Sequence, residues 1–160
     1  MMNLRMVIEE KDDSAYLSDA DAWDNNYRFC DNDGNTIYSV EGESSNWKHN
    51  LQIYHRDLQV GQVEGSMLRY DLYYVQNDRY RYVGAMTGRI RSGCRLAVKG
   101  WTMKSDRAGE YFLVRNDRGK KMALFADRKI HLFCEEDDAV LAVMMVATGW
   151  IDAYDRLCCM

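Results

Sequence analysis

The sequence contains no proline and only three histidines among its 160 residues. An ordinary composition would give roughly eight prolines, and their absence excludes collagen-like and proline-rich low-complexity chains. Charged residues make up 29% and hydrophobic residues 47% of the composition. This balance is typical of a globular protein and excludes intrinsic disorder. A chain of this length fits a single domain, which we place at residues 1–160.

The usual signatures of catalysis and metal binding are missing as well. The chain has no GxSxG elbow, no HExxH motif and no CxxC pair, and a nucleophilic triad needs a histidine brought to a Ser or Cys and a carboxylate. His131 and Cys134 form H-x-x-C, but residues three apart on a strand point to opposite faces, and zinc usually takes four ligands. We therefore expect no enzyme activity, no cofactor and no bound metal.

No hydrophobic run is long enough to cross a membrane. The longest run is residues 139–151 (AVLAVMMVATGWI), which would extend about 20 Å as a helix, whereas the hydrocarbon core of a bilayer is about 30 Å thick. Acidic residues flank this run on both sides, and they are costly in lipid. The chain opens without the apolar segment of a signal peptide, and its cysteines are odd in number. We therefore expect reduced thiols and a cytoplasmic location.

Short runs of alternating hydrophobic residues, separated by polar turns, fill the first 134 positions. In residues 27–42, Asp33-Gly34 lies between two runs rich in aromatic and β-branched residues, which is a strong hairpin signal. Hairpins repeated about every 20 residues favour a sandwich or a barrel. The acidic residues 10–25 are expected to form a loop, with Ala15–Leu17 as an alternative first strand. We expect strands at 4–9, 26–31, 35–42, 49–55, 58–65, 69–76, 79–87, 93–99, 100–105, 110–115, 119–127 and 129–134.

Residues 135–155 change to a helical pattern. Acidic residues occupy the first turn, where they complement the positive end of the helix dipole, and the hydrophobic residues that follow cover every face. A helix that is apolar all round must be buried all round, and in a chain of this size only surrounding strands can bury it. The diameter of a barrel grows with its strand number. We therefore expect a mainly β fold, a closed antiparallel barrel of about twelve strands enclosing a hydrophobic C-terminal α-helix.

This combination resembles the LURP-one-related family of the tubby C-terminal-like superfamily. The hairpins YRFCDNDGNTIYSVEG (27–42) and LQIYHRDLQVGQVEG (51–65) are similar to that family's aromatic–turn–Val-Glu-Gly units, and the acidic step before AVLAVMMVATGWIDA is similar to the start of its closing helix. The resemblance covers residues 14–155 and implies a twelve-stranded barrel around a hydrophobic helix. It also implies a lipid connection, since tubby-like relatives bind phosphoinositide headgroups through basic surface residues and scramblase-like relatives are linked to lipids. The acidic segment at 10–25 departs from the pattern.

Charge is strongly segregated along the chain, although the net charge is only -4. Residues 1–78 have 6 Lys and Arg against 15 Asp and Glu, residues 79–129 have 14 against 4, and residues 130–160 have 1 against 6. Two explanations are open. Either an anionic partner binds the basic segment, or the basic strands lie beside acidic strands that neutralise them.

The basic segment supplies the candidate site. Its cations fall on consecutive expected strands and turns, and because neighbouring strands lie about 4.8 Å apart, these cations should share one wall of the barrel. They should face outward unless they are paired, and guanidinium groups bind phosphate in a planar, forked geometry. The candidate anion-binding residues are Arg79, Arg81, Arg89, Arg91, Arg95, Lys99, Lys104 and Arg107.

The sequence favours two functions over a third, an enzyme whose site is not visible in one sequence. The first is a non-enzymatic tubby-like barrel module, peripheral at a membrane, whose basic wall binds anionic lipid headgroups or another phosphate ligand. The alternative is a module for protein–protein interaction or self-association through segregated charged faces. Free arginines favour the first function, and arginines paired with Asp or Glu favour the second. The tyrosines beside the basic residues do not by themselves indicate nucleic acid, because aromatic residues are common on β-strands.

Overall fold

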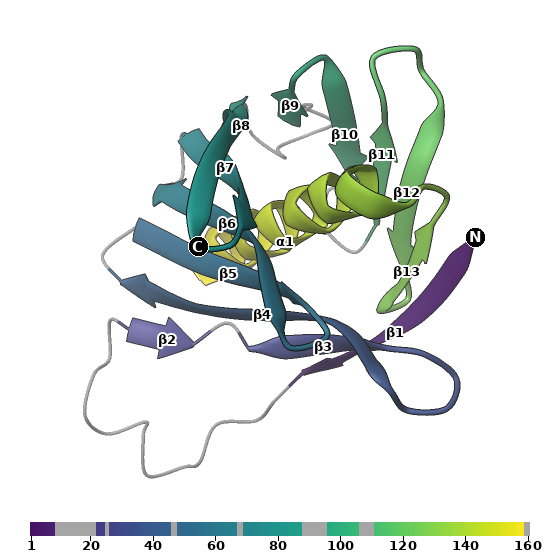
Figure 1. The fold of residues 1–160 in the computed structure, drawn as a ribbon. Helices are drawn as coiled ribbons and strands as arrows, with labels where there is room; N and C mark the ends of the chain where they lie inside the picture. The colour runs from purple at the N-terminus through teal and green to yellow at the C-terminus, as the bar shows by residue number, and fades with distance from the viewer. Residues whose placement is uncertain are drawn as a thin grey trace, which may run out of the picture.

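The computed structural model describes residues 1–8, 22–24, 26–45, 48–66, 69–87, 96–105 and 111–158. Within these residues, thirteen strands form one antiparallel sheet and a single α-helix follows them (Figure 1). The strands are β1 (Met2–Ile8), β2 (Ala22–Asp24), β3 (Tyr27–Cys30), β4 (Thr36–Ser45), β5 (Lys48–His55), β6 (Leu58–Ser66), β7 (Arg69–Gln76), β8 (Arg79–Thr87), β9 (Leu96–Val98), β10 (Trp101–Ser105), β11 (Phe112–Arg115), β12 (Lys121–Ala126) and β13 (Lys129–Leu132). The helix is α1 (Glu136–Cys158). The fold is therefore mainly β with a C-terminal helix, as the sequence predicts.

Each of the twelve predicted strands has a counterpart in the sheet, and β2 is an addition to them. β2 lies in the segment 10–25, so the prediction of a loop is wrong for residues 22–24. A strand has two edges, and β5 occupies one edge of β4 along residues 38–45. β2 and β3 therefore share the other edge of β4, and β2 continues the line of β3. The alternative strand at 15–17 lies outside the described residues.

The order of the strands brings the start of the chain beside its later part. The order is β2-β4-β3-β1-β13-β12-β11-β10-β9-β8-β7-β6-β5, with an additional pairing of β4 with β5. β1 lies between β3 and β13, with Met6 opposite Phe29 and Leu4 opposite Ile130. All four side chains are buried. The first strand thus connects the early hairpins with the late ones, and the sheet curls around α1 (Figure 1).

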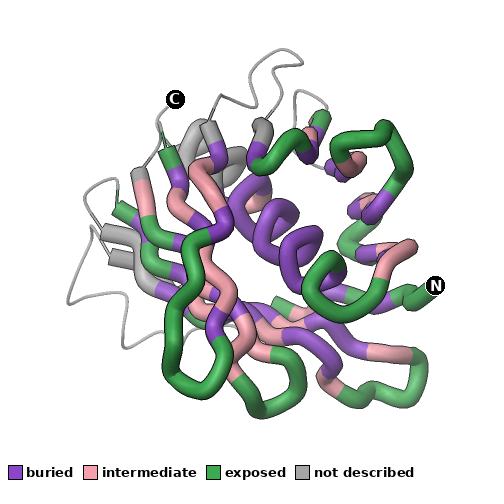
Figure 2. Tube along the Cα trace, turned by 45° about the horizontal axis from the view of Figure 1, so that its top comes forward, coloured by how far each residue is buried: buried purple, intermediate pink, exposed green. Residues whose placement is uncertain are grey.

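The helix α1 is buried on every side along its middle part. Residues 139–149 and Ile151 are all buried, and the strands surround this stretch (Figure 2). α1 contacts β5, β6 and β7 on one side of the sheet order and β11 and β12 on the other. The hydroxyl of Thr148 donates a hydrogen bond to the Met144 carbonyl oxygen at 2.8 Å, so this buried polar group is satisfied. The predicted helix at 135–155 is confirmed, with ends that differ by one and three residues.

Gly42 and Gly65 end the two Val-Glu-Gly units of the repeated hairpins, and both lie against neighbouring backbone. A Cβ atom at Gly42 would lie 2.5 Å from the carbonyl oxygen of Asn50. At Gly65 it would come still closer to the carbonyl oxygen of Arg69. A glycine inside a strand often marks such a close approach. The repeated glycines therefore have a structural cause in the packing of adjacent strands.

Replacing Met144 with aspartate should prevent folding, because Met144 has no exposed surface and an unpaired buried charge is severely destabilising. Thermal unfolding followed by circular dichroism should show no cooperative transition. Leu58→Asp is the matched control, since Leu58 is 71% exposed, and it should change the free energy of unfolding by no more than about 0.5 kcal/mol. A Met144→Asp protein that melts like the wild type would show that α1 is not the centre of the fold.

Gly65→Ala should lower the free energy of unfolding by about 1–3 kcal/mol, because the added methyl group meets backbone atoms in an already packed sheet. Gly61→Ala provides the comparison. Its methyl group would lie 2.8 Å from the sulfur of Met144, at the end of a flexible side chain, so the loss should be smaller. Urea unfolding of both variants shows which one loses more free energy of unfolding. An equal or larger loss for Gly61→Ala would contradict this explanation.

Candidate functional site

The structure describes four of the eight predicted anion-binding residues. Arg79 and Arg81 lie on β8, Lys99 lies in the turn between β9 and β10, and Lys104 lies on β10. All four are exposed. The other four predicted residues lie outside the described part of the chain, namely Arg89, Arg91, Arg95 and Arg107.

Arg81 is a paired cation, which is the exception to the expectation that these cations face outward. It lies opposite Tyr74 of β7, and its Cζ atom is 5.0 Å from the centroid of the Tyr74 ring. Its Nη2 atom is 3.5 Å from Oδ2 of Asp137 in the first turn of α1. Tyr74 packs against the core, so Arg81 lies on the side of β8 that faces the helix. This exposed ion pair contributes little to stability, and the Arg81 side chain stays 71% exposed.

Tyr74 is the titratable group most affected by this arrangement. Burial is the main cause that raises the pKa of Tyr74 to about 12, and the carboxylates of Asp137 and Asp138 raise it further. The guanidinium group of Arg81 acts in the opposite direction. The phenol therefore stays neutral at physiological pH and serves as a ring against which Arg81 packs.

Lys104 lies on a different surface, the outward side of β10 to β13 and β1. Alternation along these strands fixes the direction of each side chain. Met103, Val114, Phe125, Ile130 and Leu4 are buried against α1 or the core, and residues next to them in sequence point outward. We name this surface the basic face, and its cations are Lys104 on β10, Arg115 on β11, Lys121 on β12, Lys129 on β13 and Arg5 on β1.

The cations of the basic face lie at one end and on both sides of a central row of outward residues, two of which are leucines. Lys104, Leu113, Leu124 and His131 lie opposite one another in turn. Arg115 and Lys121 flank this row on one side, and Lys129 and Arg5 flank it on the other. Five strands separated by about 4.8 Å make the face about 19 Å wide.

Two pairs on the basic face place like charges directly opposite each other. Arg115 lies opposite Lys121, and Arg5 lies opposite Lys129. Directly opposed like charges destabilise an antiparallel sheet. The other outward positions of these registers hold no carboxylate, and none of the five cations makes an ion pair with Asp or Glu in the described ranges. Within the described ranges, these five cations therefore have no ion-pair partner on the face itself.

Sequence reasoning found only Lys104 among these five cations. Lys121 and Lys129 fall in expected strands of the basic segment, and Arg115 ends another. The alternation of hydrophobic and polar residues within those strands indicated that these three side chains point outward. Arg5 carried no such signal, because only the pairing of β1 with β13 brings it beside Lys129.

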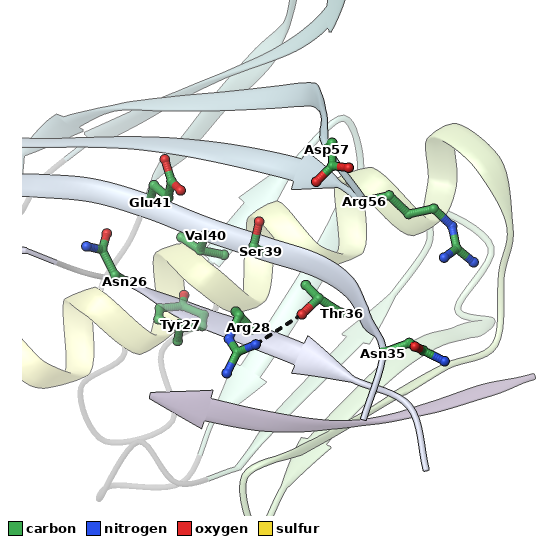
Figure 3. Close-up of a pocket in the computed structure, with 10 residues that line it drawn as sticks. All are labelled: Asn26, Tyr27, Arg28, Asn35, Thr36, Ser39, Val40, Glu41, Arg56 and Asp57. Atoms are coloured by element: carbon green, nitrogen blue, oxygen red, sulfur yellow. Dashed lines mark hydrogen bonds between the residues drawn. The ribbon is translucent and has the colours of Figure 1, made fainter. Parts of the chain in front are cut away.

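A polar pocket of about 430 Å³ lies beside the basic face, between the β3–β4 pair and the turn after β5 (Figure 3). The Nη1 atom of Arg28 donates a hydrogen bond to the Thr36 hydroxyl at 3.3 Å. Two arginines and two carboxylates balance each other in the lining, so the pocket does not select a ligand by charge. The lining residues are Asn26, Tyr27, Arg28, Asn35, Thr36, Ser39, Val40, Glu41, Arg56 and Asp57.

His131 and Cys134 do not come together as a metal site. The Nδ1 atom of His131 lies 2.6 Å from Oδ1 of Asn3 on the basic face, whereas the thiol of Cys134 donates to the Met122 carbonyl oxygen at 3.4 Å. Burial is the main cause that raises the pKa of Cys134 to about 11, so the thiol is protonated at neutral pH. Among the described residues, no group of three or more His, Cys, Asp or Glu side chains is placed to hold a metal ion.

In the part of the chain that the structure covers, no helix has both the length and the apolar character needed to span a bilayer. Comparisons of the chain with models of protein families, with curated proteins and with solved structures gave no match.

Tyr74→Phe should reduce the loss of stability at alkaline pH. In the folded chain the pKa of Tyr74 is raised from its ordinary value of 10.0 to about 12. Between these values the unfolded chain loses the proton first, so the free energy of unfolding falls as pH rises. Urea unfolding at about pH 9 and about pH 11 measures this fall in both proteins. An equal fall in the variant would show that Tyr74 does not carry the effect.

Proposed function

We propose that this chain is a non-enzymatic barrel module that binds phosphate-bearing ligands, such as the headgroups of anionic lipids, through its basic face. The observation that carries the proposal is the pair of opposed like charges, Arg115 with Lys121 and Arg5 with Lys129. This repulsion opposes folding, and a bound anion would relieve it. Arg and Lys are also the side chains that hold phosphate most strongly, through charge-assisted hydrogen bonds.

We extend the proposal to the overall architecture of the chain. We infer a closed barrel of twelve strand positions, of the tubby C-terminal-like type within the LURP-one-related family. The additional pairing of β4 with β5 supports closure, because β5 ends the strand order and β4 lies next to its other end, β2. β2 and β3 pair with successive parts of the same edge of β4. The thirteen strands therefore occupy twelve positions around the proposed barrel. The repeated glycines and the buried helix support the resemblance.

The shape of the basic face is better suited to a flat membrane surface than to a small ligand bound in a deep pocket. Its cations stand about a half-buried row of Leu113, Leu124 and His131, and each cation near an anionic leaflet contributes about 1 kcal/mol. The acidic parts of the chain would be repelled from the same leaflet, so binding would be oriented. In this proposal the protein is cytoplasmic and peripheral at a membrane, and Lys104 is the member of the predicted set at 79–107 that lies on the basic face.

Lys121→Ser with Lys129→Ser should abolish sedimentation of the full chain with vesicles containing anionic lipid. The wild type should sediment with such vesicles and not with neutral phosphatidylcholine vesicles. Binding should weaken as salt approaches 0.15 M, where exposed charges are screened beyond about 8 Å. Lys48→Ser with Arg56→Ser removes the same charge at exposed positions elsewhere and should sediment like the wild type.

Calorimetry with inorganic phosphate separates the two sources of the ligand. Heat of binding with phosphate but no sedimentation with vesicles would identify a free phosphate compound as the ligand. Equal sedimentation with anionic and neutral vesicles, or no binding to either vesicle or phosphate, would overturn the proposal.

A further inference from the structure

A second outward surface, on β5 to β8, has a different chemistry from the basic face. Tyr80 and Tyr82 of β8 are 56% and 50% exposed. The ring centroids of Tyr73 and Tyr82 lie 5.4 Å apart, and the Tyr82 hydroxyl donates to Oδ1 of Asp71 at 3.0 Å. We name this surface the tyrosine face, and it comprises Tyr54, Glu64, Asp71, Tyr73, Tyr80 and Tyr82.

The tyrosine face also contains a pair of like charges. Glu64 lies directly opposite Asp71, and such a pair is destabilising. Arg69 compensates in part, since its Nη2 atom is 3.2 Å from Oδ1 of Asp71. The Glu64 carboxylate is exposed, and its hydrogen-bond partner is the neutral amide of Gln62 at 2.6 Å.

The two faces are complementary in charge and in layout. The basic face has apolar side chains, Leu113 and Leu124, at its centre with cations around them, and the tyrosine face has aromatic rings beside carboxylates. An apolar centre with a polar rim is the usual anatomy of a protein interface, where Tyr and Arg are enriched. Cations against aromatic rings already occur within the chain, at Arg81 with Tyr74 and at Lys121 with Phe133.

We propose that the tyrosine face of one copy of this chain binds the basic face of a second copy. The contact would bring the Glu64–Asp71 pair to the cations of the partner copy and relieve the repulsion on both sides. The two faces lie on different strands, so the contact is head-to-tail and leaves a free face at each end. Such contacts add further copies unless their rotation closes a ring.

This assembly goes beyond the binding of a phosphate ligand and competes with it, because both use the basic face. Anionic lipid should therefore dissociate the copies. Salt should weaken the assembly as well, because rim charges at an interface depend on ionic strength.

Complementation between two variants tests the head-to-tail contact. The first variant, Lys121→Gln with Lys129→Gln, weakens the basic face by two of its five cations and keeps the tyrosine face intact. The second, Glu64→Gln with Asp71→Asn, keeps only the basic face, and the new asparagine retains an oxygen for the Tyr82 hydroxyl. Sedimentation velocity with reductant present should show concentration-dependent association of the wild type. Each variant alone should associate about tenfold more weakly or not at all.

An equimolar mixture of the two variants should form a 1:1 complex that grows no further, because only one pair of intact faces remains. A wild type that stays monomeric at all concentrations, or a mixture that fails to associate, would overturn the proposal. The second variant also separates the two proposals. It should lose self-association but keep sedimentation with anionic vesicles, so the loss of one property does not imply the loss of the other.

Discussion

The burial of α1 on all sides is the constraint on which the rest of the structure depends. Fully burying one Val, Leu or Met side chain contributes about 1.5–3 kcal/mol, and residues 139–149 are all buried. One layer of sheet can cover only one side of a helix, so strands must lie on both sides, as β5 to β7 and β11 to β12 do. Every strand that faces the helix must then alternate, with hydrophobic side chains inward and other side chains outward. The outward positions are released from packing and are free to carry charge.

The fold could be predicted from the sequence because two periodicities were visible. Alternation with polar turns marks the strands, and the apolar stretch from Ala139 marks a helix that cannot face water. β2 could not be predicted in the same way, because its residues, Ala22–Asp24, sit in an acidic segment and contribute no alternation of their own. Its place comes from β4, which extends to Ser45 and offers an edge that β3 leaves uncovered. The pairing with β4 therefore determines the position of β2, which the local sequence does not indicate.

The site could be predicted only as far as local sequence reaches. The excess of cations in 79–129 is a sequence property, and it includes Lys104 and Lys121. The pairing of Arg81 depends on Asp137, which is distant in sequence and comes near because α1 begins at that end of the sheet. Arg5 joins the basic face through the pairing of β1 with β13. Both results follow from strand order and helix placement, which a single sequence does not specify.

The registers bear directly on the two explanations of the segregated charge. If basic strands were neutralised by acidic neighbours, opposed outward residues would carry opposite charges. At three positions they carry the same charge, in the pairs Arg115–Lys121, Arg5–Lys129 and Glu64–Asp71. Opposed residues therefore do not neutralise each other at these three pairs, and Arg69 forms an ion pair with only one of the two carboxylates. The remaining repulsion is sustained by the buried core, and it can be relieved only from outside the sheet, by counterions or by a binding partner of opposite charge.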